Sequence, residues 1–169
     1  LTVNLYEAQP SPESAYMIGK MLMIQQKYKD AVPYMEEALN MEDADKKQSA
    51  YIYLAEINSF LKNYSKARSL AYEAAKLNPE DGKPYVLIGD MYAASAKDCG
   101  NDDLTTKVAY WAAVDKYYKA KQVDPELAES MNKRISSYEK HFPATELIFF
   151  HNLKEGESYT VGCWINEVT

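Results

Sequence analysis

A short motif recurs at nearly regular intervals along the chain, and it constrains the fold more than any other feature of the sequence. A tyrosine stands three residues before an alanine in Tyr28–Ala31, Tyr64–Ala67 and Tyr110–Ala113. The first two alanines are 36 residues apart and the second two are 46 residues apart. Periods of about 20 to 50 residues are typical of repeat proteins, in which one supersecondary unit buries its apolar face against the next. The chain is therefore predicted to be a repeat array.

The segments on either side of each motif have the apolar spacing of amphipathic helices. Pro79 ends the second helix of the middle unit, because proline cannot continue the backbone hydrogen-bond ladder and disfavours a helical Asn78. Each unit is therefore predicted to be two antiparallel helices joined by a short turn. The apolar faces of the middle unit, first upstream and then downstream of its motif, are formed by Tyr51, Leu54, Ala55, Phe60 and Leu61, and by Ala67, Leu70, Ala71, Ala74 and Leu77.

These units resemble the tetratricopeptide repeat of bacterial type, a helix–turn–helix of about 34 residues with the pattern W-x₂-L-G-x₂-Y, then A-x₃-F, then P. The main departures are Asn58 in place of the second aromatic residue, Ala15 in place of the first, and Asp43 in place of proline. The resemblance covers roughly residues 12–127 and implies an all-α fold, a right-handed superhelical array of helix pairs. The matching positions, from the third unit to the first, are Tyr85, Ile88, Gly89, Tyr92, Ala113, Tyr117, Ala120 and Pro125; Tyr51, Leu54, Ala55, Ala67, Ala71, Ala74 and Pro79; and Ile18, Gly19, Leu22, Ala31, Met35 and Ala38.

Small residues recur at the positions where the two helices of a unit must approach each other. A larger side chain at such a crossing overpacks it, at a typical cost of about 1–3 kcal/mol. We therefore expect Ala31, Ala67 and Ala113 to be buried between helices.

The third unit carries an insert near residues 96–108. Tyr92 and Ala113 are 21 positions apart, whereas the corresponding Asn58 and Ala67 are 9 positions apart. Asp102 and its neighbour Asn101 are good N-cap residues, so Leu104–Gln122 is predicted to be one long helix. The predicted segments are the tail of a preceding repeat helix at 1–11, repeat units at 12–45, 48–81 and 82–127, a capping helix at 128–142 and a β-hairpin extension at 143–169.

The pattern changes after Pro143, which ends the capping helix. Leu147–Phe150 and Ser158–Ile165 are predicted to be strands, separated by a turn-rich stretch. An isolated hairpin is marginally stable in water, so we expect this one to lie against the last helices. The side chains expected to be buried there are Ile148, Phe150, Tyr159 or Val161.

The composition is that of a folded protein with an acidic surface. Of the 169 residues, 47% are hydrophobic and 26% are charged, and the net charge is −6. This charge disfavours a nucleic acid as the main partner, because phosphate binding needs a basic surface. No apolar run approaches the length of a membrane span, so no membrane insertion is expected of this segment. Both ends suggest a piece of a longer protein, and the compartment is not predicted.

Few residues could carry chemistry. Cys99 and Cys163 leave two alternatives open, namely packing residues or a disulfide in an oxidising compartment. The acidic turn at Asp98–Asp103 lacks the residue order of a calcium loop and is expected to be a capping turn. His141 and His151 lack carboxylates at ligand spacing and are expected at the surface. No nucleotide loop, nucleophile elbow or HExxH motif is present, so we predict no cofactor, no metal and no enzymatic activity.

The surface that remains for binding is a groove. The resemblance implies that the first helices of the units line a concave groove. Its mixture of aromatic, methionine and charged residues suits a peptide with apolar side chains and a few charges. Glu56 and Asp90 would repel a carboxylate, so we expect no clamp for a C-terminal carboxylate. The predicted groove residues are Tyr16, Lys20, Met23, Tyr53, Glu56, Phe60, Lys83, Leu87 and Asp90, with Ala94 beside them.

The sequence therefore predicts a non-catalytic scaffold whose groove binds a protein or peptide partner. Two alternatives remain open. One is self-association into a homo-oligomer, through the unpaired edge of the hairpin. The other is binding of a carbohydrate or another small ligand in an aromatic-lined groove.

Overall fold

The structure is a computed structural model that describes residues 9–154 and 156–169. Its described part is mostly helical and contains one small antiparallel sheet, so the predicted all-α class with a small hairpin is confirmed. The prediction for 1–11 falls mainly outside the described residues. The elements are α2 (Pro12–Ile24), α3 (Tyr28–Ala38), α4 (Ala44–Phe60), α5 (Tyr64–Leu77), α6 (Lys83–Cys99), α7 (Asp103–Val123), η1 (Pro125–Leu127), α8 (Ala128–Tyr138), η2 (Glu139–His141), α9 (Thr145–Phe150), β1 (Thr160–Val161) and β2 (Glu167–Val168).

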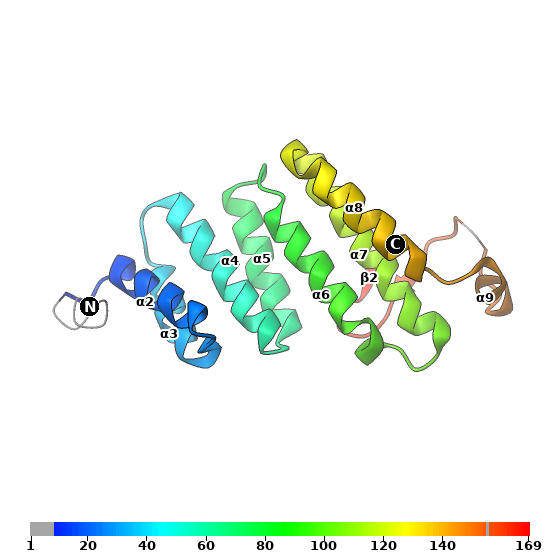
Figure 1. Cartoon of the computed structure of the whole chain (residues 1–169), viewed down its shortest axis with the longest axis horizontal. Helices are drawn as coiled ribbons and strands as arrows, with labels where there is room; N and C mark the ends of the chain where they lie inside the picture. The colour runs from blue at the N-terminus through cyan, green and yellow to red at the C-terminus, as the bar shows by residue number, and fades with distance from the viewer. Residues whose placement is uncertain (1–8, 155) are drawn as a thin grey trace. The chain divides into compact units, whose positions relative to one another are not determined.

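The chain divides into two compact units, Leu1–Pro79 and Glu80–Thr169, called unit 1 and unit 2 below. Consecutive helices pack as hairpins, α2 with α3 and α4 with α5 in unit 1, and α6 with α7 in unit 2 (Figure 1). Within the described residues, no helix combines the length and the apolar character needed to cross a bilayer.

Small residues lie at the helix crossings, as expected. Ala31, Ala67 and Ala113 are each 0% exposed. A Cβ on Gly19 would lie 2.8 Å from the Met35 side chain, so the crossing of α2 and α3 has no room for a larger residue. The close approach of these helices is therefore set by side-chain size.

The two turns of unit 1 are built alike. Gln26 and Lys62, which are 36 positions apart, have φ of 59° and 60°. The residue after each of them donates a backbone hydrogen bond to a carbonyl in the last turn of the helix. Lys27 N–H donates to the Leu22 carbonyl at 2.9 Å, and Asn63 N–H donates to the Asn58 carbonyl at 2.8 Å. This closure satisfies carbonyls that the helix end leaves without partners. The same backbone conformation therefore recurs in these two turns, at the spacing of the first two tyrosine–alanine motifs.

Asn58 stands where the repeat pattern has an aromatic residue, and its surroundings explain why a polar residue is tolerated there. The side chain is 2% exposed. Its Nδ2 donates a hydrogen bond to the Leu54 carbonyl at 2.8 Å, so the buried amide is satisfied.

In unit 2 the insert lies where the two helices meet, because α6 continues to Cys99 and α7 begins at Asp103. Helix α7 has 21 residues, whereas the corresponding α5 has 14. The Asp102 side chain accepts a hydrogen bond from the Thr105 N–H at 2.7 Å, and the Thr105 hydroxyl accepts one from the Asp102 N–H at 3.1 Å. This reciprocal cap starts α7 where the sequence predicts it. The predicted helix Leu104–Gln122 is confirmed, with one further residue at each end.

The predicted strand at Leu147–Phe150 is wrong, because these residues belong to helix α9. The N–H groups of Leu147 and Ile148 both donate to the Ala144 carbonyl, at 2.9 and 3.1 Å. A run of four apolar residues does not distinguish a strand from a helical turn. The expected burial of Phe150 is also wrong, since its side chain is 80% exposed.

The hairpin exists but lies further along the chain than predicted. Thr160 pairs with Val168 and Val161 pairs with Glu167. The predicted strand Ser158–Ile165 therefore supplies β1 and most of the turn, whereas the second strand comes from residues beyond it. Of the expected anchors, Val161 is buried.

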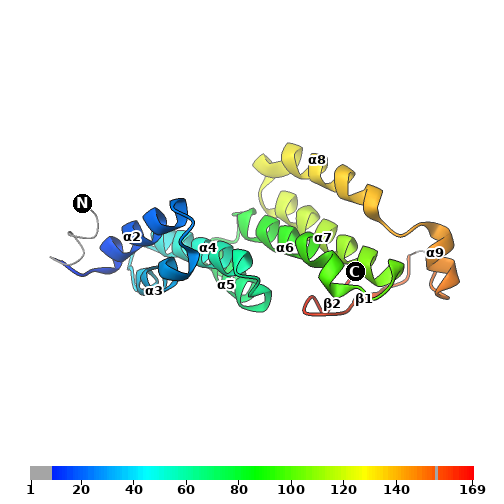
Figure 2. The same ribbon diagram turned by 60° about the horizontal axis from the view of Figure 1, so that its bottom comes forward.

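Contacts from residues distant in sequence hold the hairpin on the α6–α7 pair. Cys99 and Cys163 form a disulfide with their Cα atoms 5.4 Å apart. Trp164 Nε1 donates to Ser95 Oγ at 3.0 Å. Glu167 accepts a hydrogen bond from the Tyr92 hydroxyl at 2.6 Å. Figure 2 shows α8 above the α6–α7 pair and the hairpin below it.

Candidate functional site

Five predicted groove residues come together on unit 1, from one face of α2 and one face of α4. The rings of Tyr16 and Tyr53 are 5.9 Å apart. Lys20 Nζ lies 5.4 Å from the Tyr16 ring and 5.7 Å from the Tyr53 ring. A pocket of about 320 Å³ opens beside these rings; its lining residues are Lys20, Met23, Ile24, Tyr28, Tyr53 and Phe60. We call it the α2–α4 pocket.

Lys20 is the only charged residue among the described residues that line the α2–α4 pocket. Its ammonium forms no ion pair with any residue that the structure describes, and the faces of Tyr16 and Tyr53 are its neighbours. Burial, and then the neighbouring Tyr53, raise the pKa of Tyr16. The pocket therefore presents a cation on an aromatic surface.

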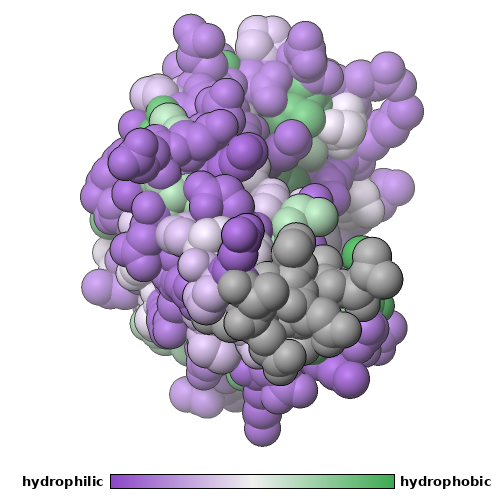
Figure 3. Space-filling view, turned by 90° about the vertical axis from the view of Figure 1, so that its left-hand side faces the viewer, coloured by the Kyte–Doolittle hydropathy of each residue, from purple (hydrophilic) through white to green (hydrophobic). Residues whose placement is uncertain are grey.

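Apolar side chains at the rim of the α2–α4 pocket remain exposed to solvent. Ile24 is 82% exposed and Phe60 is 62% exposed. Phe60 stacks on Tyr28 with ring centroids 4.6 Å apart and planes at 12°. Figure 3 views one face of the molecule, which is mainly hydrophilic with small hydrophobic patches.

Ile24 and Tyr28 are pocket residues that the sequence analysis missed. Tyr28 belongs to the recurring tyrosine–alanine motif, for which a packing role was expected. Ile24 lies one helical turn after Lys20 and so shares its face of α2, a spacing that could have identified it.

Glu56, the sixth predicted groove residue of unit 1, is half-buried on α4 but does not line the α2–α4 pocket. Burial raises the pKa of its carboxyl group.

The three predicted residues of unit 2 do not form a comparable cluster. Lys83 is exposed at the start of α6, and Leu87 is half-buried one turn later. Asp90 is engaged internally, because it accepts a hydrogen bond from the Tyr117 hydroxyl at 2.7 Å and forms an ion pair with Arg134. Burial raises the pKa of Asp90, and the two partners oppose that shift. Asp90 thus joins α6 to α7 and α8.

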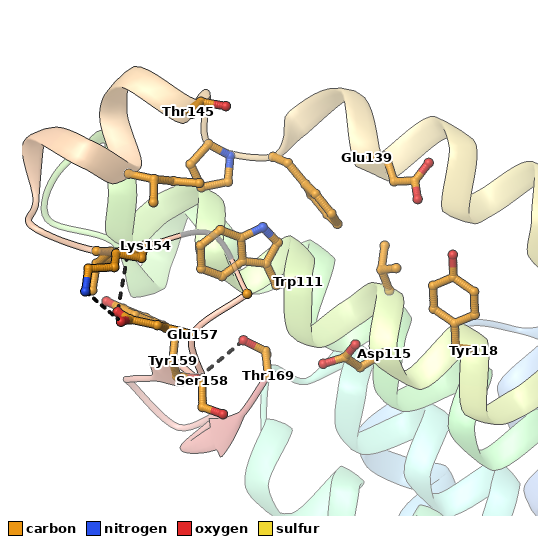
Figure 4. Close-up of a pocket in the computed structure, with 16 residues that line it drawn as sticks. Trp111, Asp115, Tyr118, Glu139, Thr145, Lys154, Glu157, Ser158, Tyr159 and Thr169 are labelled. Atoms are coloured by element: carbon orange, nitrogen blue, oxygen red, sulfur yellow. Dashed lines mark hydrogen bonds and ion pairs between the residues drawn. The ribbon is translucent and has the colours of Figure 1, made fainter.

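A cavity in unit 2 was not predicted from the sequence. It has a volume of about 450 Å³ and lies between α7 and the C-terminal extension (Figure 4). We call it the α7 pocket. Its lining residues are Trp111, Val114, Asp115, Tyr118, Glu139, Phe142, Pro143, Thr145, Ile148, Leu153, Lys154, Gly156, Glu157, Ser158, Tyr159 and Thr169.

Neither histidine belongs to a group of possible metal ligands among the described residues. The His141 ring packs 5.2 Å from the Tyr110 ring and 6.4 Å from the Tyr138 ring. In residues 9–154 and 156–169, no three or more histidine, cysteine, aspartate or glutamate side chains are grouped so that they could hold a metal ion.

Comparison with models of known protein families finds no match for this chain, and comparison with curated proteins finds none either. The chain's own residues are therefore the basis for assigning a function.

Proposed function

We propose that the chain is a non-catalytic protein-interaction module of the tetratricopeptide type. In this proposal its helix pairs stack into a right-handed superhelix, and the α2–α4 pocket binds a peptide segment of a protein partner. The observation that carries the proposal is the cluster of exposed Ile24 and Phe60 beside Lys20 in a pocket of about 320 Å³. Exposed apolar groups gathered around a cavity mark interaction sites more often than isolated ones do.

The repeat-like backbone supports the first part of this proposal. The turns at Gln26 and Lys62 have the same geometry at the same spacing. The small residues of the repeat pattern are buried at helix crossings in each pair. Helix pairs of this kind bury their remaining apolar face by stacking on neighbouring pairs.

The pocket chemistry indicates what part of a partner would bind. Aromatic and aliphatic walls suit one apolar side chain of the partner as an anchor. Lys20 would add a single favourable contact to a polar or acidic group next to that anchor. A short helical or extended segment satisfies both requirements.

The test is variant-dependent capture of a partner. Phe60→Ser removes the exposed ring, and we expect it to weaken partner binding at least tenfold in a pull-down followed by titration. Phe149→Ser is the matched control, because Phe149 is 80% exposed on α9 in unit 2. Equal retention of the partner by Phe60→Ser and the unaltered chain would contradict the proposal.

Self-association is the second candidate, and the exposed ring pair of α9 favours it. Phe149 and Phe150 are both 80% exposed. The edges of the sheet contribute little, since each strand has 2 residues. If copies associate through α9, sedimentation should reveal a dimer that the double variant Phe149→Ser/Phe150→Ser abolishes. A monomer at high concentration excludes this candidate.

A further inference from the structure

The α7 pocket combines aromatic walls with carboxylates in an arrangement that recognises a particular kind of ligand. Trp111, Asp115 and Tyr118 are four and then three residues apart, so they lie on one face of α7. Glu139 lies on the opposite wall (Figure 4). The volume of about 450 Å³ is within the range of small-ligand sites.

The aromatic wall is held in place by edge-on ring contacts. Trp111 lies 6.3 Å from Phe142, with ring planes at 89°, and 5.8 Å from Tyr159, with planes at 80°. Both partners belong to the C-terminal segment that closes the pocket. The indole is therefore fixed before any ligand arrives.

Among the described residues, the lining carries the carboxylate side chains of Asp115, Glu139 and Glu157 and the ammonium group of Lys154. Lys154 forms an ion pair with Glu157 at 3.7 Å, so Asp115 and Glu139 are the two carboxylates of the described lining that Lys154 does not pair with. Neither of these two side chains has a hydrogen bond or ion pair with a residue described in the structure. Burial raises the pKa of Asp115, and the nearby Glu167 adds to that shift while Lys116 opposes it. The two carboxylates are exposed to solvent at the pocket, and the cation nearest to Asp115, Lys116, is also paired with Glu167.

The lysines near the pocket are held by other groups. Lys116 pairs with Glu167 at 2.6 Å. Lys121 Nζ binds Asn132 Oδ1 at 2.8 Å and lies 4.5 Å from the centroid of the Tyr118 ring. The ring of Tyr118 therefore already has a cation near it, as the electron-rich face of an aromatic ring favours.

We propose that the α7 pocket binds an organic cation, an ammonium or guanidinium group carried on an aliphatic or planar body. The carboxylates of Asp115 and Glu139 would balance its charge, and Trp111 and Tyr118 would contact the body and the cation. A neutral sugar would stack on Trp111 equally well but would gain no charge attraction from the carboxylates of Asp115 and Glu139. This site is independent of the α2–α4 pocket.

The first experiment compares two ligands of nearly the same shape, of which one carries a guanidinium cation and the other a neutral urea group. Calorimetric titration of the full chain with Nα-acetyl-argininamide should detect binding, and its neutral isostere Nα-acetyl-citrullinamide should bind at least tenfold more weakly. A five-residue peptide with a central arginine distinguishes a polypeptide source from a free small cation. Equal affinities for the charged and neutral probes, or no binding of either arginine probe, would overturn the proposal.

The second experiment removes the carboxylates one at a time. Asp115→Asn and Glu139→Gln should each weaken binding of Nα-acetyl-argininamide at least fivefold. Glu42→Gln, which makes the same change of charge on an exposed residue of unit 1, should leave the affinity unchanged. Circular dichroism checks that each variant is folded. Because Glu139 is exposed, Glu139→Gln is expected to fold like the unaltered chain.

Unchanged affinity in both pocket variants refutes the assignment. Tight binding of a neutral disaccharide, with no dependence on Asp115, would instead identify a carbohydrate site and likewise overturn it.

Discussion

At Gly89 the distance between α6 and α7 leaves no space for a side chain. A Cβ at this position would lie 2.6 Å from Cε1 of Tyr117 and 3.0 Å from the Ala113 carbonyl oxygen. Tyr117 cannot easily move, because it is fully buried and its hydroxyl is bonded to Asp90. This position is the clearest case of a small residue that the packing of a helix pair requires.

We predict that Gly89→Leu destabilises unit 2 by about 1–3 kcal/mol and lowers its melting temperature by at least about 4 °C. Both tryptophans, Trp111 and Trp164, lie in unit 2, so tryptophan fluorescence follows its unfolding. Gly162→Leu is the control, because nothing lies within 4 Å of a Cβ there. If the two variants melt alike, the packing assigned to Gly89 is incorrect.

Asp115 gives a prediction about pH. Burial raises the pKa of this carboxyl group above its unfolded value, so its ionisation costs stability. The cost begins as the pH rises through the unfolded pKa of about 4 and is complete above the folded pKa. Asp115→Asn should therefore melt higher than the unaltered chain at pH 7, by roughly 1–2 °C because solvent screens a half-exposed group.

The difference should shrink toward zero as the pH falls below the unfolded pKa of about 4, because the carboxyl group then becomes protonated in both states. Melting curves of unit 2 from pH 3.5 to 7, followed by tryptophan fluorescence, test this. Glu42→Gln controls for the change in net charge. A melting temperature for Asp115→Asn that stays below that of the unaltered chain across this range would contradict the prediction. Greater stability together with weaker cation binding would indicate that Asp115 is retained for binding.

At the scale of elements, the turns of unit 1 use residues that are poorly suited to their backbone conformation. Gln26 has φ of 59°, a left-handed conformation that costs a residue with a Cβ about 1–2 kcal/mol relative to glycine. The gain in stability from glycine is smaller by about 0.5–1 kcal/mol, because glycine loses more conformational freedom on folding. The helix pair α2–α3 is therefore held together by its packing despite the turn.

We predict that Gln26→Gly raises the free energy of unfolding of unit 1 by about 0.5–1 kcal/mol. The neighbouring Gln25→Gly is the matched control, since φ is −79° there and glycine should destabilise the turn. Urea unfolding followed by circular dichroism measures both variants. Destabilisation by both substitutions to a similar extent would show that the conformation of Gln26 carries no strain.

At the scale of the whole molecule, one covalent bond joins the C-terminal segment to α6, in addition to the hydrogen bonds of Trp164 and Glu167. The disulfide joins residues 64 positions apart, from the end of α6 to the turn of the hairpin. Closing a loop of this length removes entropy from the unfolded chain equivalent to about 4 kcal/mol. The α7 pocket depends on this bond, since the segment that follows α8 forms one of its walls.

Reduction with dithiothreitol should lower the stability of unit 2 by about 2–4 kcal/mol and shift the tryptophan-monitored unfolding midpoint to lower denaturant. It should also weaken binding of Nα-acetyl-argininamide. The double variant Cys99→Ser/Cys163→Ser should not respond to reductant. An unchanged midpoint after complete reduction, verified by mass spectrometry with alkylation, would show that the bond is dispensable.

Much of the helical architecture could be predicted because its determinants are local. Pro79, the cap at Asp102 and the tyrosine–alanine motif each act within one or two helical turns. Five of the predicted groove residues meet on unit 1 because residues spaced by a helical turn share a face. Their role in binding a partner remains a prediction.

The sequence by itself determined the helix pairs, since apolar period, caps and small residues at crossings all act over short distances along the chain. Only the tertiary structure decided the C-terminal region. A run of four apolar residues became α9 instead of a strand, and the bond between Cys99 and Cys163 brought the hairpin onto α6. The α7 pocket arises from these long-range contacts, in which residues far apart in sequence pack together and exclude water. A local sequence pattern does not show which distant residues will pack against each other.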